Sequence, residues 1–579
     1  MMNTSSNCDI SIAVTGSGGA GSITAGELLL YMAGKNGCFG IMRRSFGPQI
    51  RGGEAAALVR IGPQPIECMN DAFDLWLALD WQNADRFADE IALHSESLII
   101  ADPAAGEVPA VVRELGLEVV EVPMKALAGE VPMGRPNMIA LGILTHWLNF
   151  CGDEAGLLIR QTFKRKGQAI VDGSLAAFEK GFTEPVIVEA RKRRTGPGSC
   201  EREGAGERWD LSGNEGCGLG ALRGGIRFAA AYPITPASDL LEWLSPRLAK
   251  IGGSLVQAED ELASINMVIG ASFGGVPSLT ATSGPGLALM SESIGLSIAA
   301  EVPAVIVNVQ RGGPSTGVPT KSEQADLDIA LHGMHGDAPH LVLAALDHAD
   351  CVLVTDWAVR LAEALQTAAI VLTDQNLAQS RALIPEPVYR LPDIPPRRTA
   401  KQGEDYRRYR LTPDGVSPMA IPGTPCTAYV ADGLEHSESG KPSTAAADHA
   451  AQMDKRLRKI EQFDYGEHWA DIRGSGETAI LTWGSTTSAV REAAARLRDS
   501  GTPLRVVALR LLMPASPEKL AAALDGVSRV LIVEQSHGRQ FHRYLRAYYD
   551  ISCETKVLAR PGPLLITPGE VVRAVEEWS

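Results

Sequence analysis

Between residues 227 and 326 the chain repeats one pattern, in which a short apolar run ends in a polar turn rich in glycine and proline. Apolar runs of this length, bounded by turn residues, are typical of buried strands. In a parallel sheet the carboxyl ends of the strands share one edge, where ligands bind. We therefore expect the four turns to converge on one crevice. The four runs are Arg227–Ala231, Ser254–Ala258, Ser278–Thr282 and Ala304–Val309.

Residues 10–190 alternate apolar runs with amphipathic segments, which is typical of an α/β domain. Ile10–Thr15 is predicted to be a buried strand, and Ile23–Ala33 is predicted to be the helix that follows it. The further predicted strands are Ala56–Ile61, Leu75–Leu79, Ser97–Ala101 and Glu118–Pro123, and the further predicted helices are Ile139–Phe150 and Gln168–Lys180.

The later part of the chain carries two more α/β patterns. Cys351–Thr355 and Ala369–Thr373 are predicted strands on either side of a helix over residues 357–367. After residue 476, a helix with Val490, Ala493, Ala494 and Leu497 on one face separates two strands. The strands predicted there are Thr478–Trp483, Leu504–Leu509 and Arg529–Val533.

Two segments lack any periodicity and are rich in glycine, serine, arginine or proline, namely residues 193–217 and 386–470. The first is predicted to be a linker or surface loop. The second is predicted to be an excursion over another surface, and its prolines and arginines would suit a segment that wraps a partner subunit. The predicted fold is α/β with three domains, at residues 1–193, 218–385 and 476–579, joined by segments 194–217 and 386–475.

Composition narrows the classes of protein. The chain has 579 residues, 45% of them apolar, and a net charge of −15, which argues against a general nucleic-acid binder. Nine cysteines without a C-x-x-C pair indicate neither a disulfide framework nor a self-contained zinc or iron–sulfur site. No signal pattern or membrane-length apolar run is visible, so a reduced, cytoplasmic protein is expected.

One group of histidines has the residue types of a metal site. His332, His335 and His340 lie near Asp337, but their spacing offers no helical ligand face. Loop or packing roles are therefore favoured, and no metal site is predicted on this chain.

The loop Gly16-x-Gly18-x-x-Gly21, after a strand and before a helix, fits the dinucleotide-binding pattern, and its amides could hold a phosphate. An NAD site also needs an acidic residue about 20 positions further on. Basic residues follow instead. An NAD site, a phosphate-bearing ligand such as coenzyme A and a purely structural turn all stay open. The basic residues are Arg43, Arg44 and Arg51.

Two of the turns after the repeated strands carry side chains suited to an anionic substrate. Pro233 and Pro236 fix the backbone around Thr235, so its hydroxyl is held in place, although an ordinary turn would look the same. Arg311 precedes two glycines and could clamp a carboxylate through two hydrogen bonds. The alternative for Arg311 is a surface side chain in a flexible loop.

The other two turns suit a cofactor. Glu259 ends a strand and precedes the amphipathic segment Asp260–Gly275, so its carboxyl is expected to be semi-buried and to exchange a proton with a ligand nitrogen. The alternative is a solvated acid at a helix N-terminus. Ser283-Gly284-Pro285-Gly286 allows close backbone approach to a planar or charged group.

Taken together, these segments resemble a known family. Tyr232–Pro236, Gln257–Glu259, Thr282–Gly286 and Arg311–Thr320 resemble the alpha subunit of 2-oxoacid:ferredoxin oxidoreductases, which are thiamine-diphosphate enzymes. Residues 10–190 resemble the gamma unit of the family, through Gly18-Gly19-x-Gly21 and Phe46–Gly53. Residues 476–579 resemble its transketolase-C-terminal-like domain, through Trp483–Ser485 and Val533–Gln535. The fused gamma–alpha order is most similar to the 2-oxoglutarate-specific members.

The resemblance implies a role for each matched residue. Glu259 would bond the aminopyrimidine nitrogen of thiamine diphosphate, and Thr235 and Arg311 would lie near the 2-oxo carboxylate of the substrate. Ser315 and Thr316 are also expected to bind the substrate. The remaining candidates are Pro233, Ile234, Ser283, Gly284, Pro285 and Gly286 for the cofactor, and Gly18, Gly19, Gly21, Arg43, Arg44 and Arg51 for coenzyme A.

The resemblance also implies partners. The chain lacks the Gly-Asp-Gly and downstream Asn pattern that holds Mg²⁺ and the diphosphate, and it lacks an iron–sulfur motif. In the family both belong to a separate beta subunit, which carries Mg²⁺ and a 4Fe–4S cluster. The expected enzyme is a heterotetramer of two alpha and two beta subunits that exchanges electrons with ferredoxin and uses coenzyme A.

Several alternatives stay open at this point. The 2-oxo acid could be 2-oxoglutarate, pyruvate or a branched-chain acid, because no residue here is identified as the cation for a distal carboxylate. An NAD-dependent dehydrogenase built on residues 10–60 is a different class, and the missing acidic residue argues against it. A non-catalytic assembly subunit is a third class, and the set Thr235, Glu259 and Arg311 argues against that.

Overall fold

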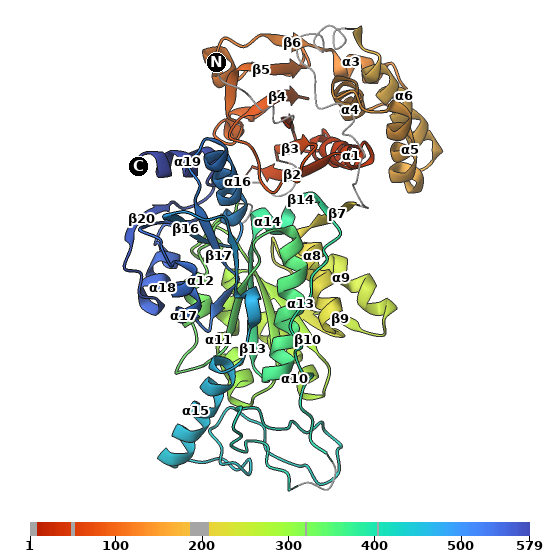
Figure 1. Cartoon of the computed structure of the whole chain (residues 1–579). Helices are drawn as coiled ribbons and strands as arrows, with labels where there is room; N and C mark the ends of the chain where they lie inside the picture. Colours follow the sequence, from red (N-terminus) through yellow and green to blue (C-terminus); the bar gives the residue numbers. More distant parts are fainter. Residues whose placement is uncertain (1–8, 48–52, 186–207, 319–320, 402–404, 579) are drawn as a thin grey trace. The chain divides into compact units, whose positions relative to one another are not determined.

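The computed structural model describes residues 9–47, 53–185, 208–318, 321–401 and 405–578. The chain forms two compact units, of which the first contains residues 1–211 and two short later segments, Ser380–Glu386 and Thr567–Gly569. The second contains the rest of the chain. Both units mix helices with sheets, so the predicted α/β class is confirmed (Figure 1). Within the described residues, no helix is both long and apolar enough to cross a membrane.

The first unit is built on a mixed eight-stranded sheet in the order β6-β5-β4-β1-β3-β2-β14-β7. Near its centre, β1 pairs in parallel with β4 and antiparallel with β3. Every residue of β1, β3 and β4 is buried, which explains why these strands appear as continuous apolar runs. The strands are β1 (Ile10–Gly16), β2 (Phe39–Phe46), β3 (Ala55–Gly62), β4 (Phe73–Ala78), β5 (Leu93–Ala101), β6 (Val119–Glu121), β7 (Arg208–Ser212) and β14 (Arg381–Pro385).

Helices cover this sheet on both faces. One face packs against α1 and the group α4 to α6, with Trp147 and Phe178 at its centre, and Figure 1 shows these helices beside the sheet. The other face packs against the short η1 and α2 around Trp76 and Phe87. The helices are α1 (Ser22–Lys35), η1 (Ala84–Phe87), α2 (Ala110–Glu114), α3 (Met124–Gly129), α4 (Pro136–Trp147), α5 (Gly152–Phe163), η2 (Lys164–Lys166) and α6 (Gln168–Phe182).

The predicted strands and helices of this region are confirmed, with two corrections. The predicted linker was wrong for residues 208–217, because they form β7 and the start of α8 (Gly213–Gly224). A capping box between Ser212 and Glu215 starts that helix, and its buried glycines hide the helical periodicity. The segment Arg381–Pro385 was assigned to the second domain, but it forms β14 beside β2 in the first unit.

The second unit contains a seven-stranded sheet in the order β18-β12-β13-β11-β10-β8-β9. Its strands run parallel, apart from the antiparallel β18 at one edge. The four strands predicted from the repeated pattern are all present and adjacent. The strands are β8 (Phe228–Ala231), β9 (Ser254–Gln257), β10 (Ser278–Thr282), β11 (Ala304–Gln310), β12 (Leu341–Ala344), β13 (Ala368–Asp374) and β18 (Leu511–Met513).

The prediction of a strand at Cys351–Thr355 was wrong, because these residues lie in α13 (His348–Leu365). The helix predicted over residues 357–367 is confirmed as the later part of α13. The first part is almost entirely buried, so its apolar run resembles that of a buried strand. Asp347 caps the helix by accepting a hydrogen bond from the Asp350 amide at 2.8 Å. The other helices on this sheet are α9 (Ser238–Lys250), α10 (Glu261–Phe273), α11 (Gly284–Ala299), α12 (Leu327–His332) and α14 (Gln375–Gln379).

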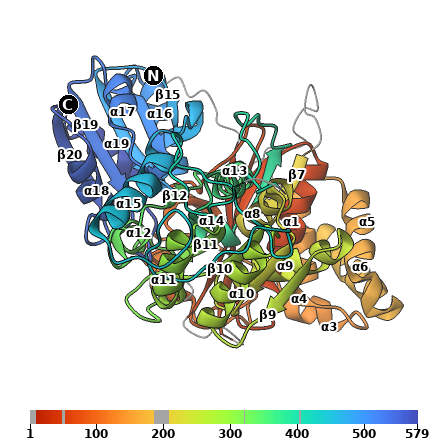
Figure 2. The same ribbon diagram turned by 90° about the horizontal axis from the view of Figure 1, so that it is seen from below.

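A five-stranded sheet in the order β15-β17-β16-β19-β20 completes the second unit, and its three predicted strands are confirmed (Figure 2). One face packs against α16 and α19 around Val490 and Val571. The other face packs toward α17 and α18, within the same core as the seven-stranded sheet. The elements are β15 (Ala470–Arg473), β16 (Thr478–Trp483), β17 (Arg505–Leu509), β19 (Arg529–Glu534), β20 (Glu554–Ala559), α16 (Thr486–Asp499), α17 (Pro517–Ala523), α18 (Gln540–Tyr548) and α19 (Pro568–Glu576).

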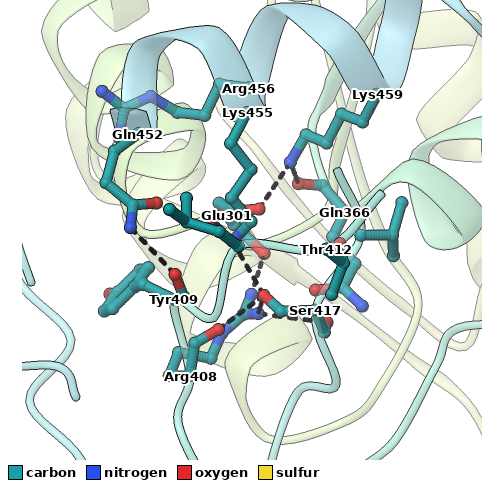
Figure 3. Close-up of polar contacts among 12 residues, drawn as sticks. Glu301, Gln366, Arg408, Tyr409, Thr412, Ser417, Gln452, Lys455, Arg456 and Lys459 are labelled. Atoms are coloured by element: carbon teal, nitrogen blue, oxygen red, sulfur yellow. Dashed lines mark hydrogen bonds and ion pairs between the residues drawn. The ribbon is translucent and has the colours of Figure 1, made fainter. Parts of the chain in front are cut away.

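The segment after β14 is irregular up to residue 445 and then forms α15 (Ala446–Glu461), a helix that sequence periodicity did not reveal. Buried charged side chains connect α15 to the amino-terminal side of the seven-stranded sheet. Lys455 and Lys459 of α15 pair with the two oxygens of Glu301 at 2.6 and 2.9 Å, three residues before β11 (Figure 3). Arg408 donates to the Glu301 carbonyl at 2.6 Å. The excursion therefore packs on its own chain through these side chains.

Candidate active site

The sheet topology places the four predicted turns side by side. Strands β11, β10, β8 and β9 are consecutive neighbours and run parallel, so the turns that follow them lie on one edge of the sheet. The convergence expected from the repeated pattern is therefore confirmed at the level of the backbone. This edge carries Thr235, Glu259, Ser283 and Arg311.

Two of the predicted residues, Thr235 and Arg311, are in direct contact. Arg311 is 7% exposed, and its Nη1 donates a hydrogen bond to the Thr235 carbonyl at 2.6 Å. Burial lowers the pKa of Arg311, and the nearby Asp326 carboxylate opposes that shift. The guanidinium Nε has no partner among the described residues. Arg311 is thus a fixed cation with donor capacity to spare, unlike the flexible surface arginine of the alternative interpretation.

Glu259 lies in a more open place than the sequence indicated. The expectation of a semi-buried carboxyl was wrong, because Glu259 is exposed and no described residue bonds to its carboxylate. The reason is the sheet order, in which β9 is an edge strand with Val256 and Gln257 also exposed. The capping role at the start of α10 belongs to Asp260, whose Oδ1 accepts from the Ala263 amide at 2.7 Å. The Glu259 carboxylate is therefore free for a group from outside this chain.

The glycines of the Ser283–Gly286 turn are close to carboxyl side chains of the protein itself. A Cβ on Gly284 would lie 2.5 Å from Asp326 Oδ1, and a Cβ on Gly286 would lie 2.8 Å from the Cγ of Glu261. Ser283 is fully buried, and its hydroxyl has no partner among the described residues. Only Gly284 and Pro285 of this turn are partly exposed, so a ligand reaches the turn through them.

The loop after Arg311 is closed by a bridge between Gly312 and Val318, whose amide donates to the Gly312 carbonyl at 2.8 Å. Ser315 and Thr316, the two predicted substrate-side residues, are exposed at its tip. No contact joins either of them to Arg311 in the described residues. Pro319 and Thr320 lie outside the described part of the chain.

Sequence reasoning missed Asp326 and Asn308. Asn308 lies in the apolar strand β11, is fully buried, and donates from Nδ2 to Asp326 Oδ2 at 2.9 Å. Burial raises the pKa of Asp326 to about 6, although Asn308 and Arg311 act against the shift. The available signal was a buried amide in an otherwise apolar strand, which needs a polar partner.

The glycine loop of the first unit lines a cavity of about 340 Å³. Gly18, Gly19 and Gly21 contribute backbone, and Arg135 and Lys166 contribute exposed cations. The side chain of Asn137 also lines it, is 5% exposed, and leaves its Oδ1 without a partner among the described residues. The cavity therefore combines backbone amides at the start of α1 with positive charge.

The basic residues predicted for this loop are placed differently. Arg43 pairs with Glu90 and Arg44 with Glu27, both at 2.9 Å, and neither arginine lines the cavity. Arg51 lies outside the described residues. At the start of the loop, the Ser17 amide and hydroxyl donate to the Asp80 carboxylate, so an anion would bind further along, toward Gly18–Gly21.

The histidine group has ordinary packing contacts. Both ring nitrogens of His340 lie 2.7 Å from backbone carbonyl oxygens, those of Ala338 and Ala330. His332 stacks on Tyr548 with ring centroids 6.0 Å apart. These contacts suit the packing role that the sequence favoured.

Comparisons with known proteins indicate the family of the chain. Residues 219–455 match the family described as pyruvate flavodoxin/ferredoxin oxidoreductase, thiamine diphosphate-binding, and residues 11–184 match pyruvate ferredoxin/flavodoxin oxidoreductase. A solved structure of 2-oxoglutarate:ferredoxin oxidoreductase from Magnetococcus marinus, with 2-oxoglutarate, coenzyme A and succinyl-CoA bound, is 35% identical. It matches with a TM-score of 0.89 over 98% of this chain and 99% of that chain.

Curated relatives give the same result. The 2-oxoglutarate synthase subunit KorA of Methanothermobacter thermautotrophicus is 31% identical over 64% of this chain and 98% of its own length. The alpha subunit of 2-oxoacid:ferredoxin oxidoreductase 1 of Sulfurisphaera tokodaii is 36% identical over 62% of this chain. That match spans 59% of the S. tokodaii subunit. The chain belongs to the family of 2-oxoacid:ferredoxin oxidoreductase alpha subunits.

Proposed function

We propose that this chain is the alpha subunit of a thiamine-diphosphate-dependent 2-oxoglutarate:ferredoxin oxidoreductase. The reaction interconverts 2-oxoglutarate, coenzyme A and oxidised ferredoxin with succinyl-CoA, CO₂ and reduced ferredoxin. The observation that carries the proposal is the edge of the seven-stranded sheet, where the buried, donor-rich Arg311 contacts Thr235 and the exposed Glu259 has no partner among the described residues. Both the bound 2-oxoglutarate of the M. marinus structure and the name of the M. thermautotrophicus relative support this substrate over pyruvate.

The edge fits half of a thiamine diphosphate site. A carboxylate free of protein partners at Glu259 can bond the aminopyrimidine nitrogen, and the partly exposed Gly284 and Pro285 allow close approach of a planar ring. When bound, thiamine diphosphate supplies the nucleophilic carbon and accepts the electrons released from the 2-oxo acid. Among the described residues, no group of three or more acidic, histidine or cysteine side chains is placed to hold a metal ion.

The chain's own residues orient the reactants. The Glu259 carboxylate holds and returns a proton at the pyrimidine nitrogen. The Arg311 guanidinium binds the carboxylate of the 2-oxo acid and fixes its direction, since its backbone contact with Thr235 already limits its motion. The Thr235 hydroxyl is on the same turn and is partly exposed, so it can donate to the 2-oxo group.

We further propose that a beta subunit covers this edge and brings Mg²⁺, the diphosphate contacts and a 4Fe–4S cluster, in a heterotetramer that transfers electrons to ferredoxin. The elements around Glu259 expose large apolar side chains, as expected for a surface that a partner covers. These are Tyr232, Val256, Leu262 and Met267, which are 37–45% exposed.

For coenzyme A, the glycine-loop cavity is the best-supported place. Gly18, Gly19 and Gly21 present backbone at the start of a 14-residue helix, where phosphate binds well. We assign the supporting cations to Arg135 and Lys166, because Arg43 and Arg44 are already paired with carboxylates.

The experiment that tests the function is a ferredoxin-reduction assay under anaerobic conditions. The chain is co-purified with its beta partner and supplied with thiamine diphosphate, Mg²⁺ and coenzyme A, and then offered 2-oxoglutarate, pyruvate and branched-chain 2-oxo acids. Coenzyme-A-dependent reduction with 2-oxoglutarate, absent from this chain alone, is expected. Reduction with a different acid would contradict the substrate, and no reduction with any acid would contradict the reaction class.

A further inference from the structure

Asp326 is a carboxyl group in the candidate active site for which the proposed function has no role so far. It directly precedes α12, and one of its oxygens, Oδ1, lies against the backbone of Gly284 in the cofactor turn. Its backbone amide donates to Gln310 Oε1 at 3.0 Å, and its Oδ2 accepts from Asn308 at 2.9 Å. Both partners lie on β11, the strand that ends one residue before Arg311. Asp326 is therefore fixed at the same edge as the substrate-binding cation.

The surroundings of Asp326 do not require it to be an anion. Its side chain makes no capping hydrogen bond to α12, and no described residue donates to its Oδ1. Among the described residues, Asn308 is the one side-chain donor to Asp326, and an amide oxygen would accept its hydrogen bond equally well. A charged carboxyl held in this partly buried place is therefore a cost to the fold. Such costs are characteristic of functional sites.

The charges around Asp326 define how it responds to an incoming anion. Arg311 is the cation that acts on it, and burial raises the pKa of Asp326 to about 6. Glu323, in the same loop, also has a raised pKa, caused by burial and by the charge of Asp326, and His537 acts on Glu323 in the opposite direction. Glu261 approaches the same turn from α10 at Gly286. The site thus holds one buried cation among several carboxyl groups.

We propose that Asp326 is a positioning residue that couples binding of the substrate carboxylate at Arg311 to the uptake of one proton by Asp326. The inference rests on the 2-oxo acid site proposed above. In the free site, the Arg311 cation and the Asp326 anion sum to zero charge. Arg311 acts on Asp326 through its charge and not through a hydrogen bond. The substrate brings a second carboxylate near this cation, and two like charges near one cation favour protonation of one of them.

The proton balance of the step is simple. The substrate enters as its carboxylate, one proton passes from solvent to a carboxyl oxygen of Asp326, and no covalent bond is made or broken in the substrate. The charges of Arg311, Asp326 and the bound substrate carboxylate then sum to zero, as those of Arg311 and Asp326 do before binding.

The test measures KM for 2-oxoglutarate against pH, from about pH 5.5 to about pH 8.5, with the assembled alpha–beta enzyme. In the wild type, KM is expected to rise with pH above about 6, approaching tenfold for each pH unit. Asp326→Asn, which keeps the shape and the acceptor for Asn308, should give a low and pH-independent KM, up to about a hundredfold below wild type near pH 8. Its kcat should change much less.

The matched control is Asp328→Asn, the same change two positions along, at a carboxylate that pairs with Arg543. It should keep the wild-type dependence of KM on pH. A wild-type KM that does not change over this range would overturn the proposal without any variant, and so would Asp326→Asn with the wild-type profile or with weaker binding at every pH.

A readout without turnover separates this inference from the proposed function. Because the folded-state pKa of Asp326 is raised, its ionised form costs stability above about pH 6, and that cost vanishes at low pH. Asp326→Asn should therefore raise the thermal midpoint of the isolated chain at neutral pH but not near pH 4. If no 2-oxo acid reacts, the proposed function is contradicted. If the enzyme turns over but its KM does not depend on pH, only the proton coupling is contradicted.

Discussion

At the scale of single residues, the side chains of the sheet edge differ in how firmly the protein holds them. Arg311 is buried and bonded to the Thr235 carbonyl, whereas Glu259 is exposed and bonds to no residue in the described part of the chain. A substrate-binding group works best when its own motion is already restricted. A group that meets a cofactor shared between subunits can be left open until the partner arrives.

Arg311→Lys should therefore impair use of the 2-oxo acid while the fold persists. Lysine keeps the positive charge but loses the planar pair of donors, and one charged hydrogen bond contributes about 1.5–3 kcal/mol, or roughly 10–100-fold in kcat/KM. Steady-state kinetics of the assembled enzyme measures this. Arg247→Lys, on the exposed face of α9 over Trp243, is the matched control and should behave as wild type. Equal kcat/KM in Arg311→Lys would remove Arg311 from the substrate site.

A site residue could be predicted from the sequence where it follows a recognisable apolar strand. Thr235, Glu259 and Arg311 stand directly after apolar runs, so the strand pattern places them on one edge. Asp326 lies 15 positions beyond Arg311 and returns to the edge through its bonds to Asn308 and Gln310. The exposure of Glu259 could not be predicted either, because the order of strands in the sheet decides it.

At the scale of elements, α15 and α11 are joined by the buried cluster of Glu301, Lys455, Lys459 and Arg408 (Figure 3). Burial alone would raise the pKa of Glu301, but the three cations outweigh burial and hold it well below its usual range. For Lys455 burial dominates over the attraction of Glu301 and lowers its pKa to about 8. The cluster fixes the irregular excursion to the sheet that carries the site.

Glu301→Gln should destabilise the second unit strongly. The substitution leaves two ammonium groups buried without a counterion, and removal of one partner from a buried pair costs about 3–5 kcal/mol. Urea unfolding of the isolated chain, followed by tryptophan fluorescence, gives the change in free energy of unfolding. Glu492→Gln, at a less buried pair with Arg496 on α16, is the control with a much smaller expected cost. A change below about 1 kcal/mol in Glu301→Gln would contradict this role of the cluster.

The same cluster predicts how stability depends on pH. Glu301 has a folded-state pKa below its unfolded value, so its contribution is complete above about pH 4.5 and is lost as the pH falls further. Thermal unfolding of the wild type between about pH 3 and pH 6 should show this loss. Glu301→Gln should show a smaller decrease over that range. Parallel curves for the two proteins would mean that other carboxyl groups cause the acid sensitivity.

Element prediction succeeded for short apolar strands and for amphipathic helices, and it failed for α15, whose buried face is mostly charged. The strands at Ile10 and Thr478 and the helix at Gln168 were predicted because apolar runs and amphipathic spacing mark them. The first part of α13 has the apolar run of a strand at Cys351–Thr355, whereas the helix predicted at residues 357–367 is the later part of α13. Strand β14 pairs with β2 through contacts nearly 340 positions apart, which no local pattern contains.

At the scale of the whole molecule, the chain carries its two candidate sites in different compact units. The glycine-loop cavity lies in the first unit, and the edge with Glu259 and Arg311 lies in the second. The two ligands of the proposed reaction, coenzyme A and the 2-oxo acid, would thus be bound by separately folded parts. Substitutions in one unit should then affect one substrate and not the other.

The double variant Arg135→Ala, Lys166→Ala tests that separation. Loss of two phosphate contacts should raise KM for coenzyme A by about tenfold or more, and leave KM for the 2-oxo acid unchanged. Arg43→Ala is the comparison, because that arginine lies outside the cavity and pairs with Glu90. A larger rise in KM for coenzyme A in Arg43→Ala than in the double variant would contradict this assignment. It would favour the arginines that the sequence suggested for the coenzyme A site.

The decisive measurement compares ferredoxin reduction by Glu259→Gln and Glu242→Gln, each assembled with the beta subunit and the full set of cofactors. Glu242 is likewise exposed, on α9, and lies outside the site edge. Glu259→Gln should lose at least about 100-fold in kcat, because proton transfer by a positioned side chain contributes about 10²–10⁴-fold. Its thermal midpoint and that of Glu242→Gln should equal the wild-type value. Full turnover by Glu259→Gln would contradict the assignment of this chain as half of a thiamine-dependent active site.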